Sequence, residues 1–370
     1  MLIVPAKPFD NLSVKEELIN EVCDGMGHSA FFKLGRHALL YTLEHFGVRP
    51  SDKVLCPAYC CKSAIEPIMA LGYDIVFIDV TADLNIDLHL LIQEIEMNNC
   101  KAIILPDYFG LFDTVSDTIY EECKYRNVIV IKDCAHSYLS YLYATKKHFC
   151  DAVILSMRKS VNIHYGGVAI ITEKKDIHKS NIEETFLSRV KFELFKRAEQ
   201  ILILSGVNIY GKTITFFKNL LNIQAPNKKL NKIIASDYEI MGVESKYLLN
   251  RSYYSLEVAN LRRMNFLKLK NLLATSGVTS PFINLNDKVP QVYPIYGDIE
   301  FCSYLRNKGV GATLWPFSDI PTEVKKALVL YPNTNFFLKH LICLPIHQGL
   351  SDTHLKKISD LIHKYVAVKQ

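Results

Sequence analysis

The strongest constraint on the fold is a series of short apolar segments that begins at residue 53. They are rich in Val and Ile and do not alternate apolar with polar residues, which is typical of strands buried on both faces of a sheet. The segments span residues 53–59, 74–80, 101–108, 127–133, 151–156 and 167–173. Residues with helical spacing lie between them, as in 61–72 and 116–127. This alternation predicts an α/β domain with a doubly wound, mostly parallel sheet.

The segments on either side of this series predict the domain organisation. Residues 36–47 have the spacing of an amphipathic helix that ends at a glycine. Residues 183–224 mix basic and apolar residues at helical spacing, which predicts a domain-connecting or subunit-packing region, with a membrane-surface helix as the alternative. A second unit begins near residue 245. Its expected elements are a helix over 255–273, a strand over 291–297, a turn over 307–312 and a helix over 351–366.

Length and composition set the class of protein. With 370 residues, the chain is long enough for a large domain, predicted over 1–240, and a smaller C-terminal α/β domain over 241–370. Apolar residues make up 49% and charged residues 22% of the chain, as in soluble globular proteins. The net charge of +5 is mild and scattered, so we expect no nucleic acid partner. We find neither a run of about 20 apolar residues nor a secretion signal, and therefore expect a cytoplasmic protein.

The cysteines favour a reducing compartment. There are ten, several of them within apolar segments, and no C-x-x-C pair occurs. We therefore predict buried, reduced cysteines rather than a disulfide framework. The alternative is a metal cluster of Cys56, Cys60 and Cys61. It is disfavoured because zinc ligands are normally paired at tighter, repeated spacing, so no metal site is predicted.

Polar residues follow several of the predicted strands, where ligands of open α/β sheets bind. They are Tyr59, Asp79, Asp107, Asp133 and Ser156, with His136 and Lys159 just downstream. Asp133 and Lys159 are the most informative, because an acid at one strand end and an amine after the next strand can face one cleft. The alternatives are an aspartate that caps the next helix and a lysine that is simply solvated.

An acid and an amine placed in this way suit pyridoxal phosphate. The amine can condense with the aldehyde, and the carboxylate can keep the pyridine nitrogen protonated. The phosphate needs hydrogen-bond donors, which the start of a helix supplies. The step into the first helix at Gly35, Arg36 and His37 is one candidate, and Ser156, in an S-x-x-K arrangement with Lys159, is another.

These residues occur within motifs that resemble the DegT/DnrJ/EryC1/StrS aminotransferases, pyridoxal-phosphate enzymes of fold type I best known for aminating nucleotide-linked keto sugars. The resemblance covers roughly residues 30–365. It is carried, in order, by "GRHALLYTLEHFGVRPSDKVLCPAY", "IVFIDVTADLNID", "AIILPDYFGLFDT", "VIVIKDCAHSYLS", "SMRKSVNIHYGG" and "HLICLPIHQGLSD". The order of the motifs is specific, whereas any one of them alone is not.

The resemblance implies a role for each site residue. Lys159 would hold the cofactor covalently and then carry a proton between the substrate carbon and the cofactor. Asp133 would pair with the pyridine nitrogen, and Ala135 would lie under the ring. His136 would lie near the ring hydroxyl, and Ser156 would bind the phosphate.

The chain also departs from the family pattern. Arg36 stands where the family commonly has Ser or Thr, so its guanidinium is expected to grip the phosphate, with a surface arginine as the alternative. The usual aromatic residue that stacks on the ring falls near Cys61, and Tyr59 is a candidate substitute. Asn250-Arg251 is a poor match to the family's N-Y-R-M segment, which sends an asparagine to the neighbouring subunit. Together these departures indicate a divergent branch.

Two further histidines, His164 and His347, are predicted to be structural or loop residues, with His164 the better functional candidate. The resemblance implies a homodimer with the active site at its interface. It also implies transfer of an amino group from an amino acid, L-glutamate, to a keto sugar in glycoconjugate or secondary-metabolite biosynthesis. The alternatives are another pyridoxal-phosphate reaction on amino acids, such as a lyase or acyl-transferase, and a non-enzymatic regulator.

Overall fold

The computed structural model defines most of the chain outside one long central segment. It describes residues 28–143, 149–160, 166–171, 255–281, 284–316 and 319–369. Several predictions lie outside these residues: the helical region over 183–224, the domain boundary at 240/241, His164 and the weak motif at Asn250-Arg251.

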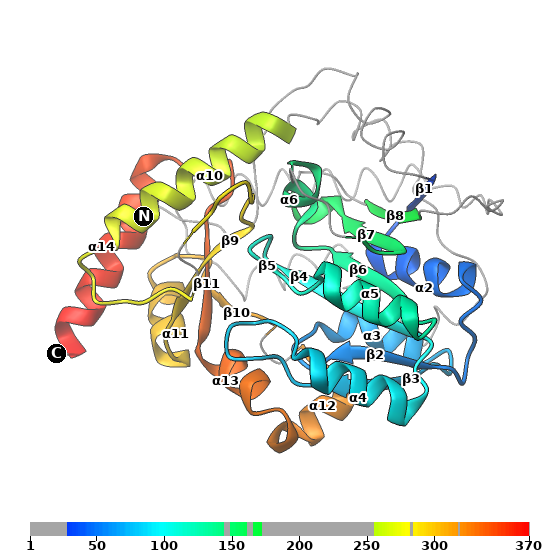
Figure 1. Cartoon of the computed structure of the whole chain (residues 1–370). Coiled ribbons are helices and arrows are strands. Elements are labelled where there is room, and N and C mark those ends of the chain that lie inside the picture. Colours follow the sequence, from blue (N-terminus) through cyan, green and yellow to red (C-terminus); the bar gives the residue numbers. More distant parts are fainter. Residues whose placement is uncertain are drawn as a thin grey trace, which may run out of the picture.

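The main sheet has eight strands, and its order is β1-β8-β7-β6-β4-β2-β3, with β5 paired to β4 (Figure 1). The strands are β1 (His28–Phe32), β2 (Lys53–Pro57), β3 (Asp74–Ile78), β4 (Ala102–Tyr108), β5 (Phe112–Asp113), β6 (Ile129–Cys134), β7 (Ala152–Ser156) and β8 (Gly167–Ile171). The pairings β2–β3, β2–β4, β4–β6 and β6–β7 are parallel, whereas β5 runs antiparallel to β4, and β8 runs antiparallel to both β7 and β1. A mostly parallel sheet is thus confirmed.

Helices cover both faces of this sheet, which explains why its strands are apolar throughout. The helices are α2 (Gly35–His45), α3 (Lys62–Met69), α4 (Leu88–Asn98), α5 (Asp117–Tyr125) and the short α6 (Tyr138–Tyr143). Val54 packs in one core cluster with residues of α2 and α3, and the next residue, Leu55, packs in another with residues of α4 and α5. Successive residues of β2 therefore enter opposite cores.

The C-terminal part contains a second, antiparallel sheet in the order β10-β11-β9. Its strands are β9 (Val292–Tyr296), β10 (Thr313–Leu314) and β11 (Leu341–Pro345), and its helices are α10 (Ser255–Leu272), α11 (Ile299–Asn307), α12 (Thr322–Lys326), α13 (Pro332–His340) and α14 (Asp352–Lys369). The helices predicted over 255–273 and 351–366 and the strand over 291–297 are confirmed. Within the described ranges, no helix combines the length and apolar character needed to cross a membrane.

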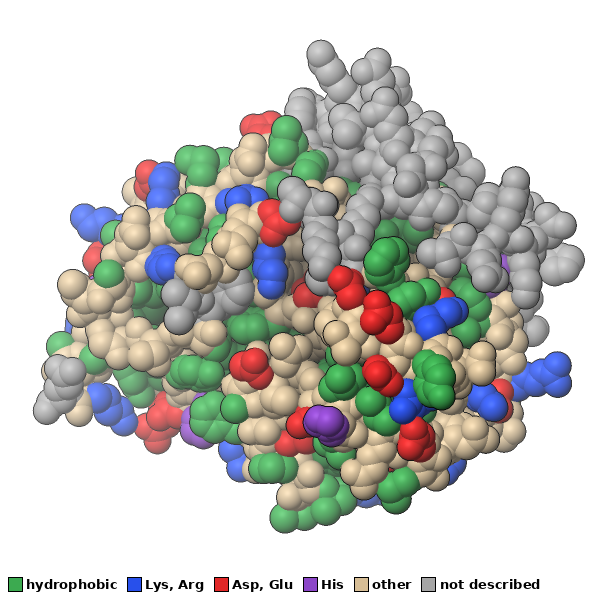
Figure 2. Space-filling view, in the orientation of Figure 1, with side chains coloured by type: hydrophobic (Ala, Val, Ile, Leu, Met, Phe, Trp, Pro, Cys, Tyr) green, Lys and Arg blue, Asp and Glu red, His purple; other side chains and the backbone are tan. Residues whose placement is uncertain are grey.

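The two sheets share one hydrophobic core. Tyr59 and Tyr108 of the main sheet belong to the same buried cluster as Phe337 and Ile346 of the C-terminal part. The rings of Tyr59 and Phe337 are 5.6 Å apart. On the surface, acidic and basic side chains are interspersed over the described part of the face shown in Figure 2.

The sheet order places a crevice between β2 and β4. The chain leaves β2 for β3 on one side and then returns to β4 on the other side of β2. At such a reversal the connections after the two strands diverge, and a ligand can enter at their carboxyl ends. The fold thus puts a site at the edge of the sheet where the polar strand-end residues lie.

Candidate active site

One cavity opens at the carboxyl edge of the main sheet, at the ends of β2, β4, β6 and β7. The predicted site residues that line it are Gly35, Arg36, Asp133, Ala135, His136, Ser156 and Lys159. His37 is not among the lining residues. Its side chain is buried, and its backbone N–H donates to the carbonyl oxygen of Leu34 at 3.0 Å. The structure therefore brings together seven of the eight predicted residues.

The start of α2, the end of β7 and β8 form a close-packed cradle. A Cβ atom on Gly35 would lie 3.7 Å from the Cβ of Ser156, which is ordinary van der Waals contact. A Cβ atom on Gly167 would lie 2.3 Å from the carbonyl carbon of Leu34 and 2.7 Å from the backbone nitrogen of Gly35. The second glycine after Lys159 thus lets β8 approach the start of α2. The cradle holds the Ser156 hydroxyl beside a helix N-terminus, which is a favourable place for an anion.

Asp133 and Lys159 face the same cavity from adjacent strands. The Asp133 carboxylate accepts a hydrogen bond from the Ala135 N–H at 2.9 Å. Part of this side chain is open to the cavity, but enough protein surrounds it that desolvation raises the pKa of Asp133. The nearby Lys159 ammonium and the Ala135 N–H oppose that rise. Lys159 ends a single 3-10 turn, η1 (Met157–Lys159), which follows β7 directly.

His136 is held as a neutral ring in one wall of the cavity. Its imidazole stacks on Phe109, with ring centres 5.6 Å apart and planes 13° from parallel. The Trp315 ring lies at 77° to the same imidazole, with ring centres 4.7 Å apart. Burial lowers the pKa of His136 well below its ordinary value, and the positive charge of Lys159 lowers it further. His136 therefore presents an uncharged aromatic surface at neutral pH.

A family of known proteins matches the part of the chain that forms this site. The model of the DegT/DnrJ/EryC1/StrS aminotransferase family matches residues 15–179, which include the cradle, Asp133 and Lys159. Residues 15–179, which are less than half of the 370-residue chain, are similar to this family. The resemblance predicted from the sequence is thus confirmed over that range.

One curated relative is similar to part of the chain. The UDP-4-amino-4-deoxy-L-arabinose–oxoglutarate aminotransferase of Shewanella sediminis is 33% identical over 103 residues, which are 28% of this chain and 26% of that protein. The match therefore spans about a quarter of that curated relative's length.

Solved structures agree over almost the whole chain. A putative sugar aminotransferase of Streptococcus pneumoniae has a TM-score of 0.66 at 18% identity, covering 100% of this chain and 94% of that one. Helicobacter pylori PseC, an aminotransferase involved in the biosynthesis of pseudoaminic acid, has a TM-score of 0.64 at 16% identity, covering 97% and 94%. At these identities the likeness shows the fold, which is that of fold-type-I pyridoxal-phosphate enzymes, as predicted.

The residues of the cavity fit pyridoxal phosphate. The cofactor carries an aldehyde, a basic ring nitrogen and a phosphate, and the cavity offers the amine of Lys159, the carboxylate of Asp133 and the Ser156 cradle. The charge of the Lys159 ammonium affects the pKa values of Asp133, His136 and Cys61, so it lies within electrostatic reach of all three. One ligand of the cofactor's size can therefore meet all of these groups.

The residue expected to stack on the ring differs from the family pattern. Cys61 lines the cavity, where its Sγ lies 3.0 Å from the Oγ of Ser63, and burial raises the pKa of its thiol. Tyr59 does not line the cavity. It is fully buried, and its hydroxyl donates to the carbonyl oxygen of Trp315 at 2.5 Å. The substitution of Tyr59 for the family's aromatic residue is thus not supported by its position.

Sequence reasoning missed Trp315 and Arg158, which also line the cavity. Cys56 and Cys60 line it too, although the sequence analysis considered them only as ligands of a disfavoured metal cluster. Trp315 is the only tryptophan of the chain and comes from the C-terminal part, far from the other site residues in sequence. Its rarity was the one available signal. The nine cysteines within the described ranges are all free.

His347 is held by a hydrogen bond within its own turn. Its side chain is 2% exposed, and its Nδ1 accepts a hydrogen bond from the Gly349 N–H at 3.2 Å. This contact agrees with the structural role predicted for it.

Proposed function

We propose that the protein is a pyridoxal-phosphate-dependent aminotransferase that moves an amino group from an amino acid, L-glutamate, to a nucleotide-linked keto sugar. The observation that carries this proposal is the shared cavity. Asp133 and Lys159 line it together, beside the Ser156 cradle. An acid, an amine and an anion site at one sheet edge are the parts that this chemistry requires.

Each group of the cavity has a separable task in this reaction. When bound, pyridoxal phosphate supplies an aldehyde for amine exchange and a ring that accepts electrons. The Nζ atom of Lys159 would bind the cofactor and later carry a proton to or from the substrate carbon. Asp133, in its desolvated position, would hold a proton at the ring nitrogen. His136 would pack its neutral face at the ring, and Ser156, Arg36 and the Gly35 N–H would hold the phosphate.

The names of relatives support a sugar as the acceptor. The Shewanella sediminis relative is named for an amino sugar and oxoglutarate, and the Streptococcus pneumoniae structure is named a putative sugar aminotransferase. We infer small-molecule substrates of that class for this chain, and a place in the biosynthesis of an amino sugar for a glycoconjugate or secondary metabolite.

The proposal extends to the cellular setting. Free cysteines, nine of them among the described residues, suit a reducing compartment such as the cytoplasm. The family resemblance supports a homodimer whose active sites lie at the interface. Sedimentation of the purified protein tests the dimer directly.

A visible spectrum before and after L-glutamate tests the proposed function. We expect purified protein loaded with pyridoxal phosphate to absorb near the wavelength of enzyme-linked cofactor, and we expect glutamate to abolish that band and release 2-oxoglutarate. Lys159→Ala should lose the band, whereas Lys308→Ala, which removes an exposed lysine, should keep it. A Lys159→Ala variant that retains the band would refute the role of Lys159. A band that glutamate leaves intact would favour the lyase or acyl-transferase alternative.

A further inference from the structure

The deepest buried charge near the proposed site comes from the C-terminal part. Arg262, on α10, is the largest fully buried side chain of the described residues, with 1% of its surface exposed. Burying a guanidinium is costly unless its N–H groups are hydrogen-bonded. The hydrogen bonds of Arg262 therefore show which parts of the protein its buried guanidinium holds together.

The guanidinium bonds to the turn that carries Lys159. Its Nη2 donates to the carbonyl oxygen of Ser160 at 3.1 Å, and its Nε donates to the Oε1 of Gln348 at 3.0 Å. The Nε2 of Gln348 donates to the same Ser160 carbonyl at 3.1 Å. Two donors from the C-terminal part thus converge on the residue that follows Lys159.

A third contact leads toward Phe109, the residue on which His136 packs. Nη1 of Arg262 donates to the carbonyl oxygen of Gln291 at 3.3 Å, and the Gln291 N–H donates to the carbonyl oxygen of Phe109 at 2.8 Å. Phe109 carries the ring on which His136 stacks. One guanidinium therefore links the lysine turn and the aromatic wall, and a planar fork of several donors is suited to do so.

The lysine turn needs such support because it is short. The 3-10 turn Met157–Lys159 is closed by the Ser160 N–H, which donates to the Met157 carbonyl at 2.9 Å, and the Met157 N–H donates to the Gly166 carbonyl at 2.8 Å. Short 3-10 turns have poor internal hydrogen-bond geometry. The Ser160 carbonyl bonds fix the other end of the turn, and with it the direction of the Lys159 side chain.

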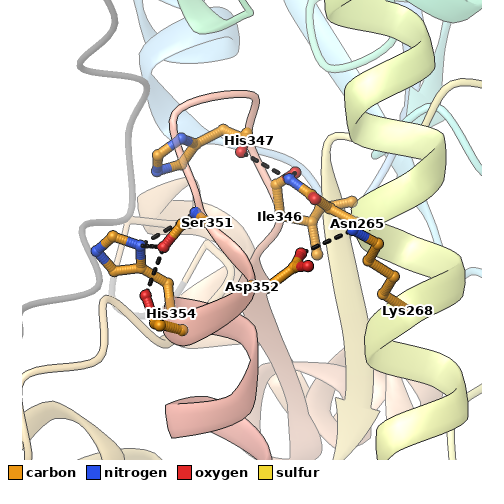
Figure 3. Close-up of polar contacts among 8 residues, drawn as sticks. Asn265, Lys268, Ile346, His347, Ser351, Asp352 and His354 are labelled. Carbon is orange, nitrogen blue, oxygen red and sulfur yellow. Dashed lines mark hydrogen bonds and ion pairs between the residues drawn. The ribbon is translucent and has the colours of Figure 1, made fainter.

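The next turn of α10 is anchored separately. The Nδ2 of Asn265 donates to the carbonyl oxygens of Ile346 at 3.3 Å and His347 at 3.1 Å, and Lys268 pairs with Asp352 (Figure 3). The Asn265 bonds join α10 to the segment that precedes Gln348, and the Lys268 pair joins α10 to the start of α14. None of these bonds goes to the lysine turn. They provide an internal comparison for the role of Arg262.

We propose that Arg262 and Gln348 are positioning residues that clamp the turn of Lys159 from the C-terminal part, so that the Lys159 amine is held toward the cavity. The inference rests on the proposed function, because it gives the clamp its purpose. Neither residue touches the reacting atoms.

Amide hydrogen exchange of the cofactor-free protein is the first test. In Arg262→Met we expect exchange in the peptide 152–160 to rise about tenfold, as for loss of a hydrogen bond to a charged group. Gln348→Glu, which keeps an acceptor for Arg262 but loses the donor to Ser160, should raise the exchange rate less.

Two control variants lie on the same helix. Arg263→Met removes the neighbouring guanidinium, which bonds to the Asn286 carbonyl, and should leave exchange in the peptide 152–160 unchanged. Asn265→Leu should raise exchange in residues 344–350 instead.

The second test measures how fast Lys159 captures pyridoxal phosphate, by borohydride quenching and peptide mass spectrometry. We expect capture by Arg262→Met to be about tenfold slower than by wild type, Arg262→Lys to recover part of the rate, and Arg263→Met and Asn265→Leu to match wild type. If Asn265→Leu slows capture as much as Arg262→Met, or if Arg262→Met behaves as wild type, the clamp is refuted. Failure of wild type itself to capture the cofactor at Lys159 would instead refute the proposed function.

Discussion

At the scale of single residues, the environment of a strand-end aspartate decides what it does. Asp79 and Asp133 both lie at or near the end of a strand of the main sheet. Asp79 accepts the N–H groups of Asn333 at 2.8 Å and Thr334 at 2.9 Å, in the first turn of α13, so it caps a helix. Asp133 instead faces the cavity and Lys159. The capping alternative considered for such acids is thus realised at Asp79.

This difference predicts opposite effects of the same substitution. Asp133→Asn keeps the volume but cannot hold a proton at a ring nitrogen, so we expect amino transfer from glutamate to fall by about a hundredfold or more, with stability at pH 7 unchanged or raised. Asp79→Asn should leave transfer near wild type and lower the free energy of unfolding by about 1–3 kcal/mol, because the α13 N–H groups lose a charged acceptor. Steady-state rates and urea unfolding measure the two effects. Loss of transfer in both variants alike would contradict the assignment.

Asp107 gives a pH-dependent prediction. Burial, and then the charge of Asp113, raises the pKa of Asp107 from its ordinary 3.8 to about 6, against the opposing charges of Lys132 and Lys288. The folded protein therefore binds more protons than the unfolded chain between these values, and its stability falls as pH rises through that window. The Asp107→Asn side chain cannot ionise, so the variant does not lose stability in this way as the pH rises.

Urea unfolding of cofactor-free wild type and Asp107→Asn across pH 4 to 8 checks this sign. We expect the stability of the variant relative to wild type to increase by about 2–3 kcal/mol between pH 4 and pH 6, and then to stay level up to pH 8. A difference that stays constant across the whole range would show that Asp107 does not titrate in this way.

At the scale of elements, apolar runs predicted β2, β3, β4, β6, β7 and β8, and helical spacing predicted α2, α3 and α5, because each of these is long enough to show its pattern. The edge strand β1 and the helix α4 were not predicted. The antiparallel direction of β8 was not predictable, because a strand buried on both faces reads the same in either direction. The two-residue strands β5 and β10 are too short to carry any period. The site residues from 35 to 159 were found through local motifs. Trp315, Arg262 and Gln348 were not, since they reach the site only through the packing of the C-terminal part.

The contact between β8 and α2 yields a prediction about glycine. In Gly167→Ala the new methyl group would collide with the backbone of Leu34 and Gly35, which cannot move without separating β8 from the start of α2. We expect a loss of about 3 kcal/mol in unfolding free energy and weaker binding of inorganic phosphate or pyridoxal phosphate. Gly35→Ala is the matched comparison. Its methyl group would meet only ordinary contacts, at 3.6 Å and beyond, so its stability should change by less than about 1 kcal/mol. Equal losses in calorimetry would contradict the cradle.

At the scale of the whole molecule, the shared core binds the C-terminal part to the main sheet. The predicted division into residues 1–240 and 241–370 stays a prediction, but the described residues of the two parts pack into one buried cluster. Trp315 lies within this junction, with its ring 5.1 Å from Tyr59 and 5.4 Å from Phe109. The site therefore exists only while both parts are folded together, since its walls come from both.

A continuous core predicts that the two parts unfold in one transition. Trp315 is the chain's only tryptophan, so its fluorescence reports on the junction, while far-ultraviolet circular dichroism reports on all helices and strands. We expect both signals to change at the same urea concentration in wild type. Phe337→Ala removes a ring that packs on Tyr59, so it should lower the free energy of unfolding by about 3–4 kcal/mol. Both midpoints should then move together to a lower urea concentration. Met97→Ala, which truncates a side chain that is 73% exposed, should shift neither. If fluorescence changes well before circular dichroism, the C-terminal part detaches while the sheet stays folded, and the core does not act as one unit.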